Sequence, residues 1–287
     1  MNIKGYKLNI FAKSKFGGNP AAIILDSENL CENDMQKIAK IIGFSETAFV
    51  MNSNCADFKV RFFTPSEEVD LCGHATIGTF FTLLNKKIIS SGLYTQETKA
   101  GTLNVDIKKD SSIMMNQSIP EFYDIIPKDE IAKSLNINIS DIEDNLPIQI
   151  VSTGLKDIIV PIKNLSILDS IKPNYNEITS ISKKYNVVGY HVFTLESMNN
   201  STAHCRNFAP LYDIPEESAT GTSNGALASY LFKYGKVNTT NNLIFEQGYC
   251  MNKPSEIIVS LSTNNEDITE VKVGGSALGL TDFELEI

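Results

Sequence analysis

The feature that most constrains the fold is a motif that occurs twice in the chain. Residues 61–65 read Arg-Phe-Phe-Thr-Pro, and residues 206–210 read Arg-Asn-Phe-Ala-Pro. In both copies a short acidic segment follows and leads to a Gly, Gly73 or Gly221, that opens a run of small and apolar residues. The two Arg lie 145 residues apart and the two Gly 148, about half of the 287-residue chain. This spacing predicts a duplicated fold with two equivalent helix N-termini.

Charge and cysteine content narrow the functional classes. The chain carries a net charge of −9, and its charged residues are scattered instead of gathered in a basic stripe. Nucleic acids and anionic membranes are therefore not expected as partners, because both attract clustered Lys and Arg. The five Cys are widely spaced, odd in number and without a Cys-x-x-Cys pair, which favours a reduced, cytoplasmic protein.

Neither a membrane segment nor a metal site is expected. Residues 1–11 alternate between apolar and polar side chains, so we interpret them as a first strand and not as a signal peptide. Every apolar run is shorter than the ~20 residues of a membrane-spanning helix. The chain has three His, and no Cys or carboxylate stands at ligand spacing from them. His191 and His204 lie in strand-like runs and are interpreted as structural residues.

Hydrophobic patterns predict an α+β protein in two halves, residues 1–120 and 121–287. Helices are expected at 33–43, 73–87 and 222–234. The last two are apolar on nearly all sides, which is typical of a helix buried by sheet, and the first is expected to begin with Asn33 as N-cap and to end at Gly43. Strands are expected at 3–10, 21–26, 46–51, 56–63, 101–107, 112–116, 148–153, 157–162, 190–195, 203–208, 243–246, 256–261 and 269–273, with a last strand at 277–286 that belongs to either half.

His74 follows Gly73 in the first turn of the first buried helix. A helix N-terminus presents unpaired N–H groups and a partial positive charge, which would bind a substrate carboxylate and disfavour protonation of the imidazole. We therefore expect a neutral His74 that donates or accepts a hydrogen bond. The alternative is that His74 only caps the helix.

The second buried helix has an acidic approach, Glu216-Glu217, ahead of Gly221 and Thr222. The backbone N–H groups of Gly221 and Thr222 are candidate donors to a developing oxyanion. An acidic residue before a helix start is also favoured by the helix dipole alone, so simple capping is the competing interpretation.

Glu46 stands at the start of a strand, directly after the helix stop at Gly43. A carboxylate enclosed by apolar walls becomes more basic, which suits the removal of a proton from carbon. The alternative is a solvated Glu at a strand end. Gly17-Gly18-Asn19-Pro20 is interpreted as a turn, which would also allow backbone to approach a ligand.

Taken together, these segments resemble the PhzF-like family, named for an isomerase of phenazine biosynthesis. The matching segments occur in order between residue 8 and about residue 280: Phe16–Ala22, Ser45–Val50, Arg61–Pro65, Asp70–Thr76 and Ala219–Thr222. The resemblance implies a diaminopimelate epimerase-like fold, in which two similar domains each roll a mostly antiparallel sheet around a central helix, with the active site between them. It also implies cofactor-independent isomerisation of a small carboxylate-bearing metabolite by proton transfer at carbon, and a homodimer.

The resemblance further implies residue roles. Glu46 matches the general acid/base, and His74 and Glu217 match residues that orient the substrate and its proton. The substrate-binding candidates are Asn19, Ser45, Gly73, Gly221 and Thr222.

Three residues depart from the family pattern at the second helix. Glu217 stands where the family has Asp, Ser218 where it has Pro, and Thr222 where it has Ser. The extra methylene of Glu217 moves the carboxylate by roughly 1 Å, and a misplacement of ~1 Å can lower a rate ~100-fold. The identity of the substrate is therefore not inferred from the family.

Two other functions remain open. A one-base epimerase or a hydrolase-like enzyme would use Cys72, because a helix N-terminus lowers the pKa of a thiol. A racemase with two thiols is disfavoured, since Thr220 occupies the matching position in the second half. The third possibility is a small-molecule binding protein that has kept the helix starts and lost the chemistry.

Overall fold

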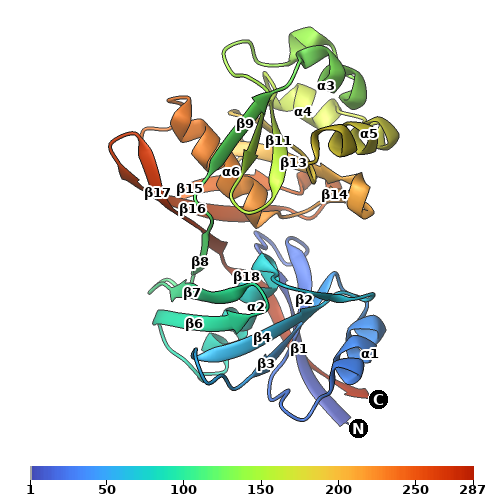
Figure 1. Ribbon diagram of the computed structural model, residues 1–287, viewed down its shortest axis with the longest axis vertical. Helices are drawn as coiled ribbons and strands as arrows, with labels where there is room; N and C mark the ends of the chain where they lie inside the picture. The colour runs from blue at the N-terminus through green and yellow to red at the C-terminus, as the bar shows by residue number, and fades with distance from the viewer. Residues whose placement is uncertain (1) are drawn as a thin grey trace. The chain divides into compact units, whose positions relative to one another are not determined.

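The computed structural model describes residues 2–287, which form two compact units (Figure 1). Unit 1 comprises the residues up to Asn116 together with Gly274–Ile287, and unit 2 comprises Gln117–Val273. The chain therefore enters unit 2 at Gln117 and returns to unit 1 at Gly274.

Unit 1 is built on a mixed, mostly antiparallel sheet. Its strands are β1 (Asn2–Ile10), β2 (Asn19–Ile24), β3 (Glu46–Met51), β4 (Phe58–Phe63), β5 (Glu68–Val69), β6 (Gly92–Thr98), β7 (Gly101–Ile107), β8 (Ile113–Gln117) and β18 (Ala277–Glu286). They pair in the order β18-β1-β2-β3-β4-β6-β7-β8, and the pairs β2–β3 and β4–β6 are parallel. Parallel neighbours need a crossover connection, and helices α1 (Glu32–Ile42) and α2 (Gly73–Asn85) lie in these two connections.

Unit 2 repeats this plan. Its strands are β9 (Glu121–Ile125), β10 (Gln149–Ser152), β11 (Lys156–Pro161), β12 (Gly189–Thr194), β13 (Ala203–Ala209), β14 (Ile214–Glu217), β15 (Leu243–Gln247), β16 (Ser255–Asn264) and most of β17 (Asp267–Gly275). The order β9-β10-β11-β12-β13-β15-β16 again has two parallel pairs, β11–β12 and β13–β15. The helices are α3 (Lys128–Leu135), α4 (Leu165–Ser170), α5 (Tyr175–Tyr185), α6 (Gly221–Lys233) and the short 3₁₀ turns η1 (Ile139–Asp141), η2 (Pro210–Tyr212) and η3 (Tyr249–Met251).

The duplicated motif is confirmed, and its acidic segments have a structural purpose. In unit 1 the guanidinium of Arg61 on β4 binds the Glu68 carboxylate on β5 through two nitrogens, at 2.6 and 2.7 Å. In unit 2 Arg206 on β13 binds Glu216 on β14 in the same way, at 2.9 Å for both contacts. Each guanidinium also lies over a Phe two residues further along its strand. The motif therefore encodes a strand pair held by a bidentate ion pair just before the buried helix.

The two buried helices, α2 and α6, lie against the inner faces of the two sheets, as their all-round apolar pattern predicts. Helix α2 packs on β1, β2 and β3, and α6 packs on β10, β11 and β12. Both helices approach the strands at a glycine. A Cβ at Gly78 would lie 3.1 Å from the Ile10 side chain, and one at Gly225 would lie 2.9 Å from the Val273 side chain. The absence of a side chain at these two positions allows close packing.

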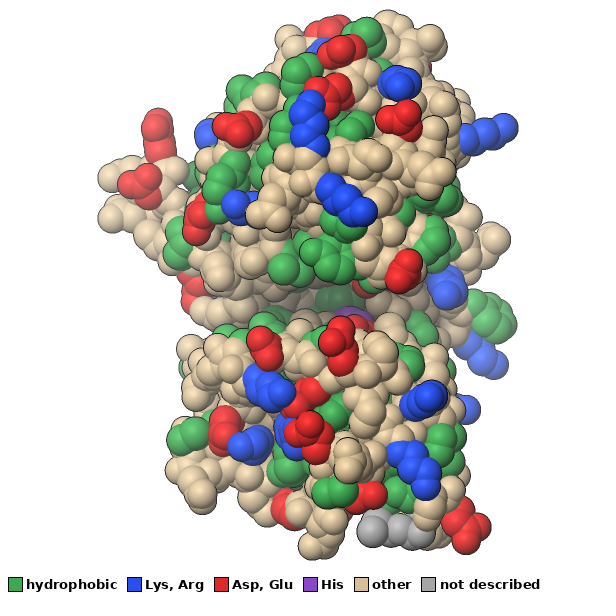
Figure 2. All heavy atoms as spheres, turned by 45° about the vertical axis from the view of Figure 1, so that its right-hand side comes forward, with side chains coloured by type: hydrophobic (Ala, Val, Ile, Leu, Met, Phe, Trp, Pro, Cys, Tyr) green, Lys and Arg blue, Asp and Glu red, His purple; other side chains and the backbone are tan. Residues whose placement is uncertain are grey.

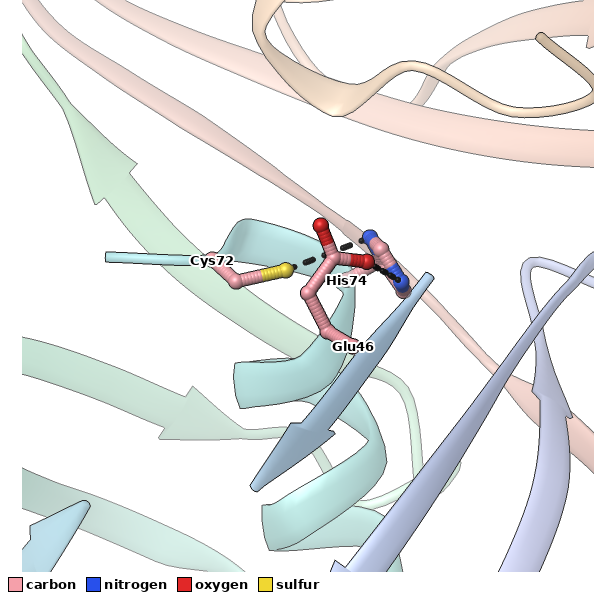
Figure 3. Close-up of side chains that lie close together, drawn as sticks. All are labelled: Glu46, Cys72 and His74. Carbon is pink, nitrogen blue, oxygen red and sulfur yellow. Dashed lines mark hydrogen bonds and ion pairs between the residues drawn. The ribbon is translucent and has the colours of Figure 1, made fainter. Parts of the chain in front are cut away.

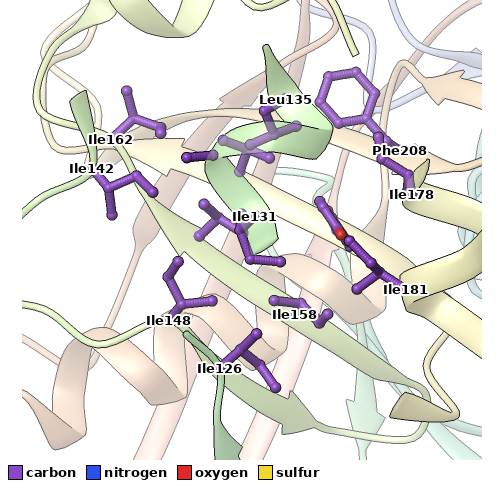
Figure 4. Packing of buried hydrophobic residues seen from close by; sticks show 14 of the residues in the cluster. Ile126, Ile131, Leu135, Ile142, Ile148, Ile158, Ile162, Ile178, Ile181 and Phe208 are labelled. Atoms are coloured by element: carbon purple, nitrogen blue, oxygen red, sulfur yellow. The ribbon is translucent and has the colours of Figure 1, made fainter. Parts of the chain in front are cut away.

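The outer faces of the sheets are covered by the remaining helices. In unit 2 an apolar cluster (Figure 4) joins α3, α4 and α5 to the strands. Its members include Ile131 and Leu135 of α3 and Ile158 of β11. In unit 1, Met35 and Ile38 of α1 belong to a cluster with Phe49 and other strand residues. Strands covered on both faces carry consecutive apolar residues instead of alternating ones.

Most of the expected elements are present. The short strands β5, β9 and β14 and the short helix α4 were not expected, and there are three further differences. Strand β6 and helix α5 were not predicted, because β6 is polar along both faces and α5 carries few apolar residues. The N-cap of α1 is Cys31 and not Asn33; the Cys31 backbone N–H donates to the Asp34 carboxylate at 3.2 Å. The predicted stop at Gly43 is confirmed, with φ at +70°.

The surface agrees with the scattered charge of the sequence. On the face drawn in Figure 2, Lys and Arg side chains lie among Asp and Glu side chains. Among the helices of residues 2–287, none is long and apolar enough to cross a membrane.

Candidate active site

The first helix start brings Glu46 and His74 together. Glu46 is the first residue of β3, which runs parallel to β2, and α2 packs on both strands. His74 lies in the first turn of α2, after the N-cap residue Cys72. The imidazole consequently lies between the Glu46 carboxylate and the Cys72 thiol (Figure 3).

The contacts of His74 use both ring nitrogens. Its Nε2 lies 3.0 Å from Oε2 of Glu46, and its Nδ1 lies 3.3 Å from Sγ of Cys72. The Ser45 hydroxyl lies 3.5 Å from Nε2 and donates to the Pro20 carbonyl at 3.4 Å. The side chains of His74 and Glu46 are 10% and 20% exposed, so the pair is shielded from water and still accessible to a small ligand.

The prediction of a neutral His74 is wrong. Burial opposes a positive charge on the ring, but the neighbouring sulfur of Cys72 and carboxylate of Glu46 outweigh it and hold the pKa of His74 well above its ordinary value. Burial likewise works to raise the pKa of Glu46, yet the facing imidazole lowers it overall. Both shifts favour a protonated His74 opposite an ionised Glu46, because the groups that face the ring oppose the effect of burial.

The expectation of a lowered thiol pKa at Cys72 is also wrong. The residue is 8% exposed. Burial raises the pKa of Cys72, and the negative charge of Glu46 adds to this effect. A protonated thiol is a poor nucleophile and a poor base, so this position does not favour chemistry at Cys72.

The same three residues were not recognised in the sequence as a metal-ligand cluster. Ligand atoms of Glu46, Cys72 and His74 lie within 4.8 Å of one another, because the fold brings Glu46 from β3 to the Cys72-x-His74 segment. The thiol and the carboxylate, however, face opposite nitrogens of the ring. One metal ion binds a single imidazole nitrogen, so this arrangement suits hydrogen bonding and not chelation by all three groups.

Two of the predicted substrate-binding positions, Asn19 and Gly73, begin the elements next to this cluster, β2 and α2. The turn ends at Gly18, whose φ is +81° and whose Cβ would meet the Ile10 carbonyl oxygen at 2.4 Å. Asn19 is buried and already begins β2, next to Pro20, which accepts the Ser45 hydrogen bond. Gly73 and His74 precede the first helical hydrogen bond of α2, from the Thr76 N–H to the Cys72 carbonyl, so their N–H groups are placed to receive an anion.

The second helix start gathers the other predicted residues. The Thr220 hydroxyl, at the N-cap of α6, donates to Oε2 of Glu217 at 2.6 Å. Gly221 and Thr222 form the first turn, ahead of the first helical hydrogen bond, from the Asn224 N–H to the Thr220 carbonyl. The Thr222 carbonyl accepts a hydrogen bond from Thr153 at 3.0 Å, which fixes the orientation of this turn.

Sequence reasoning missed a set of buried polar residues beneath α6. All five are at most 3% exposed: Asp157, His191, Asn207, Asn224 and Gln247. His191 was interpreted as structural, and its two ring nitrogens are both hydrogen-bonded. The signal in the sequence was the placement of polar side chains within otherwise apolar strands, since buried polar groups require partners.

A comparison with family models matches residues 8–282 to the phenazine biosynthesis-like proteins, the PhzC/PhzF family. The chain belongs to this family. It is 37% identical to an uncharacterized isomerase of Clostridium acetobutylicum, over 98% of this chain and 97% of that protein. The crystal structure of a PhzF-family protein of Bacillus anthracis superposes with a TM-score of 0.91 at 33% identity, covering 100% of both chains.

A more distant PhzC/PhzF relative has a named substrate. The trans-2,3-dihydro-3-hydroxyanthranilate isomerase of Pseudomonas chlororaphis is 26% identical over 94% of this chain and 95% of that protein. Family membership and the fold around the two helix starts agree with the resemblance found in the sequence, including the α+β class with a sheet around a central helix in each unit.

Proposed function

We propose that the protein is a cofactor-independent isomerase that moves a proton between carbon atoms of a small carboxylate-bearing metabolite. The observation that carries this proposal is the ion pair of Glu46 with His74 at the start of α2, at 3.0 Å. Relatives named isomerases, at up to 37% identity over nearly the whole chain, support the reaction class.

Glu46 is the proposed general acid/base. Its carboxylate is ionised at neutral pH because His74 lowers its pKa, so it is ready to accept a proton from carbon. When it has taken the proton, the charge of the imidazolium is no longer balanced by Glu46 and becomes available to the negative charge that develops on the substrate. Return of the same proton to another carbon restores the ion pair and completes an isomerisation.

The substrate class follows from the donors around this pair. The N–H groups of Gly73 and His74 point out of a helix N-terminus, which favours a carboxylate or an enolate oxygen. Glu217, Gly221 and Thr222 are proposed to orient the substrate from the second helix start, and Asn19 and Ser45 to line the first. We propose a homodimer as well, which sedimentation equilibrium tests.

The experiment is deuterium incorporation from D₂O into a panel of small carboxylic acids, read by mass spectrometry. The panel includes trans-2,3-dihydro-3-hydroxyanthranilate together with cyclic and amino acids that carry an acidic C–H. Glu46→Gln is compared with the wild type, and Glu32→Gln is the matched control, because Glu32 is 69% exposed and pairs with Arg61 in the same unit. We expect label with the wild type and the control, and a loss of at least ~100-fold with Glu46→Gln.

Each other result identifies a rival. Label that persists in Glu46→Gln and disappears in Cys72→Ser would replace Glu46 by Cys72 as the base, as in a one-base epimerase. Saturable binding of a compound, with no label in any compound, would indicate a binding protein instead of an enzyme.

A further inference from the structure

A continuous chain of hydrogen bonds in unit 2 ends at Glu217. It leads in order through Asn207, His191, Asn224, Gln247 and Thr220 to the Glu217 carboxylate. The sheet register explains the start of this chain, because Asn207 on β13 lies directly opposite His191 on β12 and opposite Glu217 on β14. The first four residues are at most 3% exposed, so they form their hydrogen bonds away from water.

The first links define the state of His191. Nδ2 of Asn207 can only donate, and it lies 3.2 Å from Nδ1 of His191. Oδ1 of Asn224 can only accept, and it lies 3.3 Å from Nε2. The ring is therefore neutral with its proton on Nε2. Burial lowers the pKa of His191 to about 4, in agreement with this state.

The later links run in the same direction. Nδ2 of Asn224 donates to Oε1 of Gln247 at 2.9 Å, and Nε2 of Gln247 donates to the Thr220 hydroxyl oxygen at 3.0 Å. The Thr220 hydroxyl then donates to Glu217 at 2.6 Å, the shortest of the links. Short contacts are typical of a charged acceptor, and hydrogen bonds aligned in one direction strengthen each other.

We infer that this directed chain is a positioning device, which holds Glu217 as an ionised acceptor with its carboxylate fixed at the start of α6. Thr220, Gln247 and His191 are its positioning residues. Their importance for the reaction rests on the proposed function. Their effect on the position and charge of the Glu217 carboxylate is independent of it. Amide groups do not relay protons readily, so the device orients and stabilises charge and is not a proton pathway.

Unit 1 offers an internal comparison. There a buried glutamine also supports the helix start, since Gln96 donates to the Thr76 hydroxyl at 2.9 Å. Thr76 then donates to the Cys72 carbonyl at 2.9 Å, so this chain ends on backbone. Support of a helix alone therefore accounts for the arrangement in unit 1. Unit 2 has the same kind of backbone support, since Nδ2 of Asn224 donates to the Thr220 carbonyl and Nε2 of Gln247 donates to the Glu217 carbonyl, both at 2.8 Å. Only the link from the Thr220 hydroxyl to the Glu217 carboxylate requires the additional explanation given above.

Other charged groups near Glu217 define what the test must resolve. A side branch leads from Asn207 through the Ser223 hydroxyl to the Asp157 carboxylate. Burial raises the pKa of Asp157 to about 7, and the negative charge of Glu217 contributes in the same direction. Glu216, the preceding residue, is already bound by Arg206. Glu217 must therefore be observed separately from Asp157.

The test is a ¹³C NMR titration of protein labelled selectively at the glutamate carboxyl carbon, with the Glu217 signal assigned from Glu217→Gln. Thr220→Val removes the last donor with little change of shape, and Thr220→Ser keeps the hydroxyl. We expect the Glu217 midpoint to rise by about one pH unit in Thr220→Val and to stay near the wild-type value in Thr220→Ser. Ser229→Ala is the matched control, because the buried Ser229 hydroxyl donates to the Gly225 carbonyl in the same helix. In this variant the Glu217 midpoint is expected to be unchanged.

A second variant tests the chain beyond its last link. Gln247→Met should raise the midpoint by less than Thr220→Val, and the double variant should raise it by less than the sum of the two single shifts. Gln247 acts on the carboxylate through the Thr220 hydroxyl, and it also holds the Glu217 backbone carbonyl, to which its Nε2 donates at 2.8 Å. Additive shifts, or an unshifted midpoint in Thr220→Val, would overturn the inference.

The kinetic readout separates this inference from the proposed function. With a compound that exchanges deuterium in the wild type, Thr220→Val is expected to lower kcat about 10-fold, to leave KM nearly unchanged and to move the acidic limb of the rate profile upward. If Thr220→Val shifts the titration and no compound exchanges, the proposed function fails and the positioning device stands. If compounds exchange deuterium and the titration of Glu217 does not shift in Thr220→Val, the positioning device fails and the proposed function stands.

Discussion

The ion pair of Glu46 and His74 predicts a specific dependence of stability on pH. Glu46→Gln removes the anion and keeps the shape of the side chain. The raised pKa of His74 gives a contribution to stability that is complete below its ordinary value of 6.5 and is lost as pH rises through the raised value. The lowered pKa of Glu46 gives a contribution that is complete above 4.5 and is lost as pH falls through the lowered value. The two contributions are therefore complete together between about 4.5 and 6.5.

The size of the effect follows from burial. Removing one partner of a fully buried pair costs about 3–5 kcal/mol, and the 20% exposure of Glu46 places this pair below that range, at about 2–3 kcal/mol. Above the raised pKa of His74 the wild type keeps a buried carboxylate opposite a neutral ring. The difference between wild type and Glu46→Gln should then fall to within about 1 kcal/mol of zero.

Urea unfolding followed by circular dichroism, at pH 5.5, 7.0, 8.5 and 9.5, measures this difference. Asp144→Asn serves as the control, because the 68% exposed Asp144 carboxylate pairs with Lys128 and Lys163 at the surface; its effect should be small and constant over this range. A difference between wild type and Glu46→Gln that stays within about 1 kcal/mol of zero even at pH 5.5 would show that His74 is neutral and would refute the reasoning.

Two further predictions concern thiol reactivity and the duplicated arginines. With N-ethylmaleimide at pH 8, followed by peptide mass spectrometry, Cys72 should react at least ~10-fold more slowly than the exposed Cys31 and Cys55, since it is buried and its pKa is raised; reaction of Cys72 at their rate would contradict the assignment of a protonated thiol. Arg206→Gln should lower the free energy of unfolding by about 3–5 kcal/mol, and Arg61→Gln should lower it by clearly less. The side chain of Arg206 is 7% exposed, whereas that of Arg61 is 20% exposed. Arg206 also donates to the Leu168 and Ile171 carbonyls, at 3.1 and 3.0 Å. Equal losses in chemical denaturation would mean that these two carbonyl contacts contribute nothing.

The sequence predicted the features that depend on neighbouring residues. The repeated Arg motif and the apolar helices at 73–87 and 222–234 follow from spacing and periodicity, and both are confirmed. Strand β6 and helix α5 were missed, because their few buried side chains produce a weak periodic signal. In α5 the buried positions are Ile178, Ile181 and Ser182.

Protonation states could not be predicted from the sequence. The expectation of a neutral His74 used the helix N-terminus, which is visible in the sequence, and lacked the carboxylate of Glu46, which a different element brings to the ring. The buried chain to Glu217 was missed for a similar reason, since its members come from four strands and from helix α6 with its N-cap. Such properties depend on which side chains meet in three dimensions.

The pairing of β18 with β1 has a consequence for synthesis of the chain. Asn2 lies opposite Glu286 in this pair, so the sheet of unit 1 joins segments from opposite ends of the described chain. Unit 2 is a single continuous segment between them. On the ribosome, unit 2 can fold as soon as it emerges, whereas unit 1 must wait with an open edge at β1 until β18 has been made. The sheet of unit 1 can therefore be completed only after the whole of unit 2 has been translated.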